Sequence, residues 1–248
     1  MSDHSPNSSV WSLAGNDPFA GAGIQADMRA AAGTRTTLRT LITSFTAQND
    51  YGLLAAEAMH RTWLDQQWSA LAAMETPAAY KVGLLLQAET VRWLADRLDP
   101  KVPLILDPVF ATSSGSSFFD PDLLSSLHEY LFHRVALLTP NRPEAEAIVG
   151  FKLSSDAEVR RAAVQIRALG VKAVLIKGGH NEGERLLDYF DDGGQTFFLE
   201  AIRQPGHYRG TGCTLSTSLA CYLAQGLELR DAVVAAHSYV QAAIAEAH

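Results

Sequence analysis

The sequence predicts an α/β fold of three layers, in which helices cover both faces of a mostly parallel sheet with antiparallel strands at an edge. Short apolar segments of strand length alternate with longer segments that have the period of helices. This alternation, which is typical of parallel sheets, continues along all 248 residues without a long linker, repeat or low-complexity segment. Late in the chain, two short apolar segments flank a polar, glycine-containing turn and indicate a β-hairpin.

The elements are expected in the following order along the chain. Short apolar runs predict parallel strands at residues 10–14, 38–46, 80–85, 102–106, 135–138 and 173–177. Helical periodicity predicts helices at residues 23–32, 55–73, 88–98, 121–131, 142–149, 157–169, 212–225 and 231–247. The hairpin comprises residues 187–190 and 196–201. We expect one domain over residues 1–248, with a flexible terminus at residues 1–9.

Composition limits the classes of function. Hydrophobic residues make up 47% of the chain, which is enough for a large core. There are 27 acidic and 20 basic residues, a formal net charge of −7, and the basic residues are scattered. We therefore expect no nucleic-acid partner, and an anionic nucleotide would need a local binding site. No apolar stretch is long enough to span a bilayer, so we expect no membrane association.

The redox state and location follow from the cysteines and the N-terminus. Cys213 and Cys221 fall in one predicted helix at a spacing too wide for an easy disulfide. The first residues are polar and lack the basic and apolar regions of a signal peptide. We expect reduced thiols and a cytoplasmic protein.

The most informative motif is Gly-Thr-Gly-Cys at residues 210–213, which runs into an apolar helical segment. Two glycines before a helix point backbone N–H groups at one spot, and such a spot binds anions, phosphate above all. A helix N-terminus also lowers the pKa of a cysteine. The pattern fits phosphoryl transfer to a hydroxyl group, with Cys213 taking the proton. A tight turn with an inert helix cap is the alternative that the motif alone leaves open.

Polar residues also follow several predicted strands. They are Gly15-Asn16-Asp17, Asp107-Pro108, Thr139-Pro140-Asn141 and Lys177-Gly178-Gly179-His180, after the first, fourth, fifth and sixth parallel strands. Ligands of open α/β sheets bind beyond the carboxyl ends of strands. These segments are therefore expected to form one site.

Four segments, taken together and in order, resemble a known family. They are AGNDPFAGAGIQAD at 14–27, TAQN at 46–49, LTPNRPEAE at 138–146 and GTGC at 210–213. The chain resembles the hydroxymethylpyrimidine/phosphomethylpyrimidine kinases of thiamin biosynthesis, which belong to the ribokinase-like superfamily. The resemblance implies a ribokinase-like fold and ATP-dependent phosphorylation of 4-amino-5-hydroxymethyl-2-methylpyrimidine. It leaves open whether the monophosphate is a second substrate.

The resemblance also implies roles for individual residues. Gly15, Asp27, Gln48 and Leu84 would contact the pyrimidine, and the Gln48 amide suits a ring nitrogen beside an exocyclic amine. Thr211, Gly212 and Cys213 would face the transferring phosphoryl group. ATP would be bound by Asp107, Asn141, Lys177 and Thr211. Mg²⁺ would be held by Glu144, mainly through water, and by Asp107.

Two departures from the family pattern bear on the substrate. Arg209 replaces the usual His before Gly-Thr-Gly-Cys, where it could contact phosphate or face solvent, and Leu84 replaces a Met in a pocket wall. A pyridoxal or pyridoxine kinase is the close alternative, and Gln48 modestly favours the aminopyrimidine. A non-catalytic pyrimidine-binding protein is a second alternative, against which Cys213, Asn141, Glu144 and Lys177 argue. Relatives of this kind are often dimers, and we expect a homodimer.

Overall fold

A nine-stranded sheet forms the centre of the computed structural model, which describes residues 9–111, 118–178, 185–204, 206 and 208–246. The strand order is β3-β2-β1-β4-β5-β6-β7-β8-β9. The strands are β1 (Ser9–Asn16), β2 (Thr37–Asn49), β3 (Gly52–Ala58), β4 (Ala79–Val82), β5 (Leu104–Leu106), β6 (Val135–Leu138), β7 (Val174–Ile176), β8 (Arg185–Asp191) and β9 (Thr196–Ile202). From β2 to β7 the pairs are parallel, whereas β3 at one edge and β8 and β9 at the other pair antiparallel.

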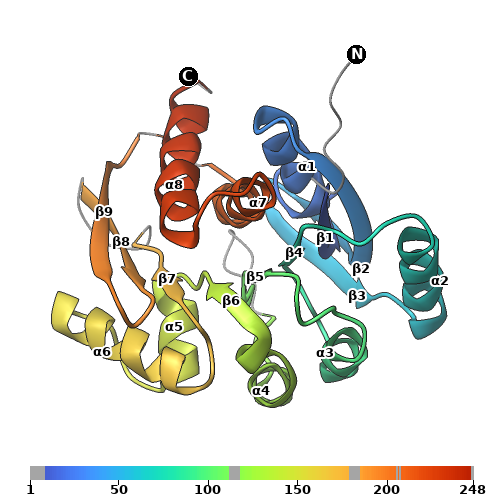
Figure 1. Ribbon diagram of the computed structural model, residues 1–248, viewed down its shortest axis with the longest axis horizontal. Helices are drawn as coiled ribbons and strands as arrows, with labels where there is room; N and C mark the ends of the chain where they lie inside the picture. Colours follow the sequence, from blue (N-terminus) through green and yellow to red (C-terminus); the bar gives the residue numbers. More distant parts are fainter. Residues whose placement is uncertain (1–8, 112–117, 179–184, 205, 207, 247–248) are drawn as a thin grey trace.

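Helices cover both faces of this sheet (Figure 1). The helices α1 (Gly23–Gly33), α7 (Thr211–Ala224) and α8 (Leu229–Glu246) lie on one face. The other face carries α2 (Arg61–Ala72), α3 (Ala88–Ala95), α4 (Pro121–Ser126), α5 (Arg142–Val149) and α6 (Asp156–Ala168). Two short turns, η1 (Leu127–Leu131) and η2 (Phe132–Arg134), follow α4. The predicted three-layer fold is confirmed.

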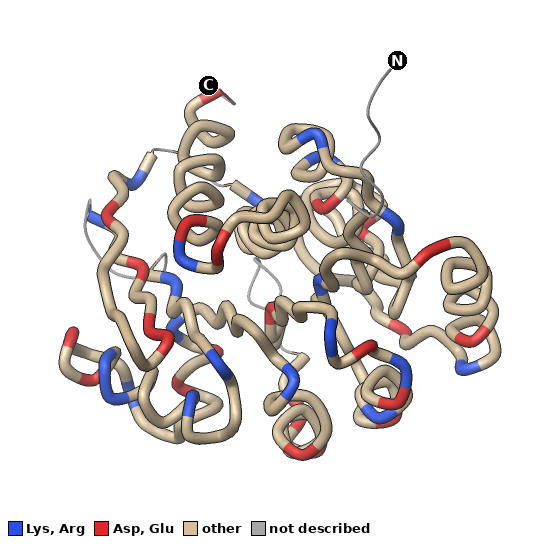
Figure 2. The backbone as a smooth tube through the Cα atoms, in the orientation of Figure 1, with Lys and Arg blue, Asp and Glu red and all other residues tan. Residues whose placement is uncertain are grey.

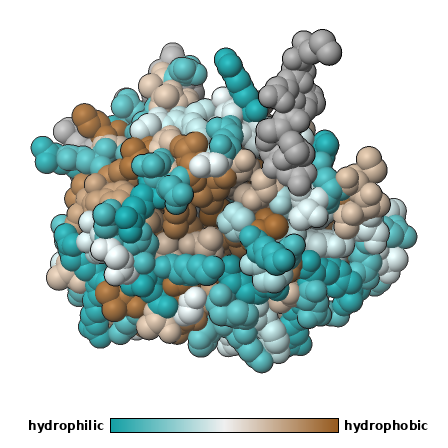
Figure 3. Space-filling view, viewed as in Figure 1, coloured by the Kyte–Doolittle hydropathy of each residue, from teal (hydrophilic) through white to brown (hydrophobic). Residues whose placement is uncertain are grey.

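Successive side chains of a strand point to opposite faces of the sheet, and this divides the buried apolar residues into two clusters. Trp11 and Tyr80 belong to the cluster under α2 to α6, whereas their neighbours Val10 and Ala79 pack with α7 and α8. Both faces of the strands are therefore buried, which is why these strands are nearly continuous apolar runs. Figure 3 shows hydrophobic residues concentrated around α7 and α8 within a more hydrophilic rim.

Charged residues are spread over the outer helices and loops, with basic and acidic positions interspersed (Figure 2). Among the described helices, none is long and apolar enough to cross a membrane.

One predicted helix is partly wrong. Residues 55–73 were expected to be helical, but residues up to Ala58 form the edge strand β3, and α2 begins only at Arg61. The alanine-rich start favours a helix by propensity, yet Ala55 and Ala56 pair with Ala47 and Thr46 of β2. Tertiary pairing outweighs local propensity here. His60 then caps α2, because its ring nitrogen accepts from the Thr62 N–H at 3.3 Å.

The remaining predicted elements are present, and their ends either match or move by up to three residues. The helix predicted at residues 121–131 is divided into α4 and η1. Ser9 was expected in the flexible terminus, but it is the buried first residue of β1. Residues 1–8 lie outside the described part of the chain. The predicted hairpin is β8 with β9, and it places antiparallel strands at the expected edge.

Candidate active site

A single cavity of about 920 Å³ brings together most of the site residues expected from the sequence. Its size is at the upper end of the range for small-molecule sites. The predicted residues on its wall are Gly15, Gln48, Leu84, Asp107, Asn141, Glu144, Lys177, Thr211, Gly212 and Cys213. The cavity lies beyond the carboxyl ends of the parallel strands, where ligands of open α/β sheets bind. The predicted convergence of the polar loops is confirmed for these residues.

The N-terminus of α7 forms one wall of the cavity. Gly210 caps the helix with a left-handed backbone (φ +74°), and a Cβ there would lie 2.2 Å from the carbonyl oxygen of Gly21. Only glycine allows this close approach between the start of α7 and the β1–α1 loop. The first-turn N–H groups of α7 have no acceptor within the helix, and Thr211, Gly212 and Cys213 line the cavity. This wall is suited to an anion.

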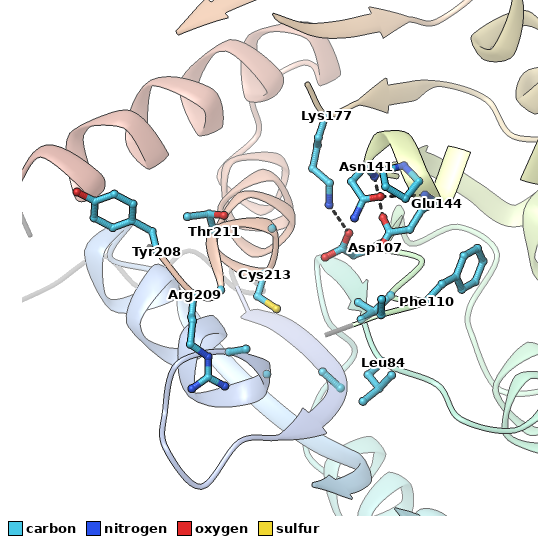
Figure 4. Close-up of a pocket in the computed structure, with 18 of the residues that line it drawn as sticks. Leu84, Asp107, Phe110, Asn141, Glu144, Lys177, Tyr208, Arg209, Thr211 and Cys213 are labelled. Atoms are coloured by element: carbon cyan, nitrogen blue, oxygen red, sulfur yellow. Dashed lines mark hydrogen bonds and ion pairs between the residues drawn. The ribbon is translucent and has the colours of Figure 1, made fainter. Parts of the chain in front are cut away.

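A buried ion pair faces the start of α7. Lys177 Nζ donates to Asp107 Oδ1 at 2.7 Å, and Thr139 Oγ1 donates to the same oxygen at 3.2 Å. A Cβ on Gly212 would lie 3.2 Å from Lys177 Nζ and 3.6 Å from Asp107 Oδ2. Burial opposes the charge on Lys177, but Asp107 and Glu144 outweigh it and hold the pKa of this amine above its usual range. The ammonium group is therefore a permanent cation beside the helix N-terminus (Figure 4).

Glu144 interacts electrostatically with Lys177 and Asp107, and it also caps the N-terminus of α5. Its Oε2 accepts from the Asn141 N–H at 2.7 Å, while Asn141 Oδ1 accepts from the Glu144 N–H at 2.9 Å. This capping box starts α5. Burial raises the pKa of Glu144 to about 7, and Asp107 adds to the shift, whereas Lys177 opposes it. The structural role is thus certain from the geometry, and the buried carboxyl group titrates in the neutral range.

The carboxylates of Asp107 and Glu144 are suited to bind Mg²⁺ only when water and substrate phosphates supply its other ligands. Among the described residues, no three His, Cys, Asp or Glu side chains are grouped closely enough to hold a metal ion. Asp107 and Glu144 supply hard oxygen donors on the cavity wall. Mg²⁺ commonly takes one or two carboxylates and completes its shell with water and substrate phosphates. The two residues fit such a site.

Cys213 lines the cavity from the first turn of α7, with Asp107 and Leu84 on the facing side (Figure 4), but the pKa of its thiol differs from the prediction. The helix terminus was expected to lower the pKa of the thiol. Burial instead raises this pKa to about 11, and the carboxylates of Asp27 and Asp107 act in the same direction. Lys81 opposes the shift without reversing it. Loss of water and two nearby negative charges outweigh the helix N-terminus, so the free protein holds a protonated thiol at neutral pH.

Asp27 does not occupy the place expected for a pyrimidine contact. It is fully buried, and Lys81 Nζ donates to its two carboxylate oxygens at 2.9 and 2.8 Å. Ser12 and Thr217 hydroxyls donate to the same oxygens at 2.5 and 2.7 Å. All the usual acceptor positions of the carboxylate are therefore occupied. Lys81 lines the cavity and Asp27 is not among the described residues that do.

The sequence does contain an indication of this pair, although Lys81 was not among the expected site residues. Lys81 stands between Tyr80 and Val82 in a strand that is buried on both faces. A charge in such a strand requires a buried partner. The Asp27–Lys81 pair joins α1 to β4 beneath the cavity, where it stabilises a fixed arrangement of the floor.

Gly15, Leu84 and Gln48 form the opposite end of the cavity. A Cβ on Gly15 would lie 2.7 Å from Ser44 Oγ and 3.1 Å from Leu84 Cδ2, so the backbone of β1 is packed tightly there. The Gln48 amide nitrogen donates to Thr46 Oγ1 at 2.8 Å. Asn16 and Thr46 line the same end. A planar ring would meet both an apolar wall and a fixed amide.

Arg209 reaches this end and does not face solvent. Its Nη2 donates to Asp17 Oδ2 and to Gln48 Oε1, each at 3.0 Å, and its Nη1 donates to Asp50 Oδ1 at 3.1 Å. In Figure 4 the guanidinium extends away from Cys213 toward the N-terminal segments. Asp17 and Asp50 are partners that sequence reasoning did not identify. His180 of the Lys-Gly-Gly-His motif lies outside the described residues.

Comparisons with known proteins agree with this geometry. The model of the phosphomethylpyrimidine kinase family matches residues 17–248. A hydroxymethylpyrimidine/phosphomethylpyrimidine kinase of Synechococcus elongatus is 39% identical over 94% of this chain and 89% of that protein. The crystal structure of a phosphomethylpyrimidine kinase from Clostridium difficile has a TM-score of 0.82 at 33% identity, covering 95% of this chain and 99% of the other.

A further solved structure is more distant in sequence. It is the pyridoxal kinase from Staphylococcus aureus in complex with AMP-PCP and pyridoxal, with a TM-score of 0.86 at 25% identity. It covers 95% of this chain and 87% of that enzyme. The fold is therefore shared with a phosphomethylpyrimidine kinase and with a pyridoxal kinase, whereas the family model and the relatives of higher identity are named as pyrimidine kinases. This chain belongs to the phosphomethylpyrimidine kinase family.

Proposed function

We propose that this protein transfers the γ-phosphoryl group of ATP to the hydroxymethyl oxygen of 4-amino-5-hydroxymethyl-2-methylpyrimidine, as a kinase of thiamin biosynthesis. The observation that carries the proposal is the arrangement of one cavity. An anion-binding helix start and a buried cation, Gly212 and Lys177, lie together at one end. An oriented amide, Gln48, lies at the other. Membership of the family supports this assignment of the two ends.

The reaction needs positioning and charge stabilisation more than covalent chemistry. The substrate oxygen attacks the γ-phosphorus, the bond from that phosphorus to the ADP oxygen breaks, and the hydroxyl proton leaves. The N–H groups of Gly212 and Cys213 and the Lys177 ammonium would bind the phosphoryl oxygens, where negative charge is concentrated. The Thr211 hydroxyl and Asn141 would position the ATP phosphates.

We propose Cys213 Sγ as the acceptor of the hydroxyl proton. The pKa of about 11 means that a small fraction of the free enzyme carries the thiolate at neutral pH. That thiolate is a strong base, and Lys81 is the nearby cation that favours it. The rate should therefore increase as the pH rises above neutrality.

Magnesium would be held by Asp107 and Glu144, with water and ATP oxygens completing its shell. When bound, it would neutralise phosphate charge. At this end of the cavity Lys177 already pairs with Asp107, so the carboxyl groups of Asp107 and Glu144 face a single ammonium group, that of Lys177, before a nucleotide enters. The added phosphate charge needs a further cation, which is the reason we include Mg²⁺.

A pyridoxal kinase is the second candidate, favoured by the close structural match to such an enzyme. The discriminating experiment is ATP consumption by the purified protein with each alcohol, with and without Mg²⁺, with products identified by ³¹P NMR. We expect Mg²⁺-dependent turnover that is faster with the aminopyrimidine. Adding the pyrimidine monophosphate as a third substrate tests the second phosphorylation. Pyrimidine binding without any ATP turnover would assign the protein to the non-catalytic class.

A further inference from the structure

Gln48 has its side-chain amide held in one orientation by two independent partners. Arg209 Nη2 contacts Gln48 Oε1 at 3.0 Å, and a guanidinium has donors but no acceptor, so the amide oxygen must face it. On the other side, the Thr46 hydroxyl donates its only hydrogen to the Asn16 carbonyl oxygen at 2.7 Å. Thr46 can therefore only accept from Gln48, and the amide nitrogen must face Thr46 at 2.8 Å.

The guanidinium is itself held in place from several sides. Asp17 is fully buried, and its Oδ2 accepts from both Arg209 and the Ala22 N–H, the latter at 2.8 Å. Asp17 Oδ1 accepts from the Phe19 N–H at 2.9 Å, so the β1–α1 loop fixes this carboxylate. A Cβ on Gly21 would lie 2.9 Å from Arg209 Cζ, which shows that the guanidinium lies directly against the loop. The position of Arg209 is thus set by Asp17 and by the β1–α1 loop that holds Asp17.

We propose that Arg209 is a specificity-determining positioning residue, which fixes the Gln48 amide so that it reads an aminopyrimidine ring in preference to a pyridoxal ring. This inference rests on the proposed function, because it takes Gln48 as the ring contact. After its two bonds, the amide keeps one N–H and one lone pair. A ring nitrogen beside an exocyclic amine uses both. At the edge that carries its ring nitrogen, pyridoxal has a methyl group in place of the amine and can use only one.

The test compares kcat/KM for the pyrimidine and for pyridoxal across four proteins: wild type, Arg209→Met, Gln48→Leu and the double variant. Loss of one charge-assisted hydrogen bond should raise the pyrimidine KM by roughly 5- to 20-fold in Arg209→Met, with little change in kcat. The ratio of kcat/KM for the pyrimidine to kcat/KM for pyridoxal should also fall, by a smaller factor because pyridoxal uses one of the two amide contacts. In the Gln48→Leu background, Arg209→Met should add less than about twofold, because the amide that it positions is gone.

Two further variants separate positioning from a merely structural role. Asp50→Asn is the matched control, since Asp50 is exposed and contacts Arg209 through Nη1, whereas Gln48 is contacted by Nη2. In this variant the ratio of kcat/KM for the pyrimidine to kcat/KM for pyridoxal should stay near that of wild type. Thr46→Val removes the second partner of the amide without touching Asp17, and should lower the ratio as Arg209→Met does. It provides the test if removing the cation beside buried Asp17 prevents folding. Melting temperatures and the ATP KM are recorded for every variant.

The outcomes distinguish this inference from the proposed function. If wild type does not use or bind the pyrimidine, both fail. If Gln48→Leu weakens the pyrimidine selectively but Arg209→Met and Thr46→Val leave the ratio unchanged, only the role of Arg209 is overturned. Additive effects in the double variant, or equal losses for both rings and ATP, would likewise assign Arg209 to holding the loops together.

Discussion

The two ends of the cavity are built in different ways. At the phosphate end, Asp107, Lys177 and Asn141 follow β5, β7 and β6, three neighbouring strands of the parallel sheet. At the ring end, Arg209 connects the β1–α1 loop, the edge hairpin of β2 and β3, and the segment before α7. The first end is held by the sheet itself, and the second by side-chain hydrogen bonds between distant loops.

This difference separates what the fold determines from what individual side chains determine. Phosphate chemistry is common to many substrates, and a sheet edge with a helix N-terminus provides it by geometry alone. Ring recognition is specific to the substrate, and in our proposal it depends on the Gln48 amide, which hydrogen-bonds to Arg209 and Thr46. Substitutions at the two ends should therefore have separable effects, and the predictions below test that separation.

The largest effect is expected where the two ends meet. Cys213→Ser should fold normally and bind both substrates, but its kcat should fall by about 10²- to 10⁴-fold, the usual contribution of a general base. The anion-binding N–H groups of α7 remain in this variant. Steady-state kinetics and melting temperature measure the two properties, with the buried Cys221→Ala as the cysteine control. A Cys213→Ser enzyme with a near-wild-type rate and pH profile would show that the proton leaves by another route.

The raised pKa of Cys213 predicts a strong pH dependence of alkylation. Below a pKa of about 11, the thiolate fraction grows tenfold per pH unit, so alkylation should be roughly 100-fold faster at pH 9.5 than at pH 7.5. Mass spectrometry of Cys221→Ala protein follows the reaction at Cys213 alone, and bound pyrimidine should protect the thiol. A rate that levels off near pH 8.5 would mean that the helix N-terminus outweighs burial.

A smaller effect, on the Mg²⁺ dependence of the rate alone, is expected from the titration of Glu144 at the phosphate end. With a pKa of about 7, this carboxyl group is mostly protonated at pH 6 and mostly ionised at pH 8, and only the ionised form attracts Mg²⁺. The Mg²⁺ concentration for half-maximal rate should therefore fall about tenfold between these pH values. Glu144→Gln retains an oxygen for the Asn141 N–H and should fold, but it should lose this pH dependence and keep pyrimidine binding.

Glu146→Gln is the matched control for that experiment, because Glu146 lies on the same helix and pairs with Lys152 away from the cavity. Its half-maximal Mg²⁺ concentration should follow that of wild type at each pH. If Glu144→Gln does so as well, Glu144 serves only to start α5.

The phosphate end could be predicted from the sequence because each of its residues directly follows an apolar strand or opens a helix. At the ring end the resemblance named Gly15, Gln48 and Leu84, which line the cavity, but it could not give the contact of Arg209 with Gln48, because these residues are 161 positions apart and their contact depends on how two loops pack. The same applies to Asp27 and Lys81, 54 positions apart, whose pairing removed Asp27 from the expected ring contacts. The pKa of Cys213 was wrong for a related reason, since burial and neighbouring carboxylates are properties of the fold and not of the motif.

The edge strand β3 shows a further limit. Its alanines satisfy a helical pattern, and only the partner strand β2 decides otherwise. The sequence pattern therefore predicted the central strands better than this edge strand. The central strands are short apolar runs buried on both faces, whereas the residues of β3 fit a helix as well as a strand.

The most direct test of two separate ends is calorimetric binding of AMP-PCP with Mg²⁺, and of the hydroxymethylpyrimidine, to Lys177→Met and Gln48→Leu proteins. We predict that Lys177→Met loses roughly tenfold or more in affinity for the nucleotide, because it removes the buried cation, and stays within about twofold for the pyrimidine. Gln48→Leu should show the reverse, since an unpaired ring group costs about 1–3 kcal/mol. Equal losses of both ligands in either folded variant would contradict the separation of the phosphate and ring ends.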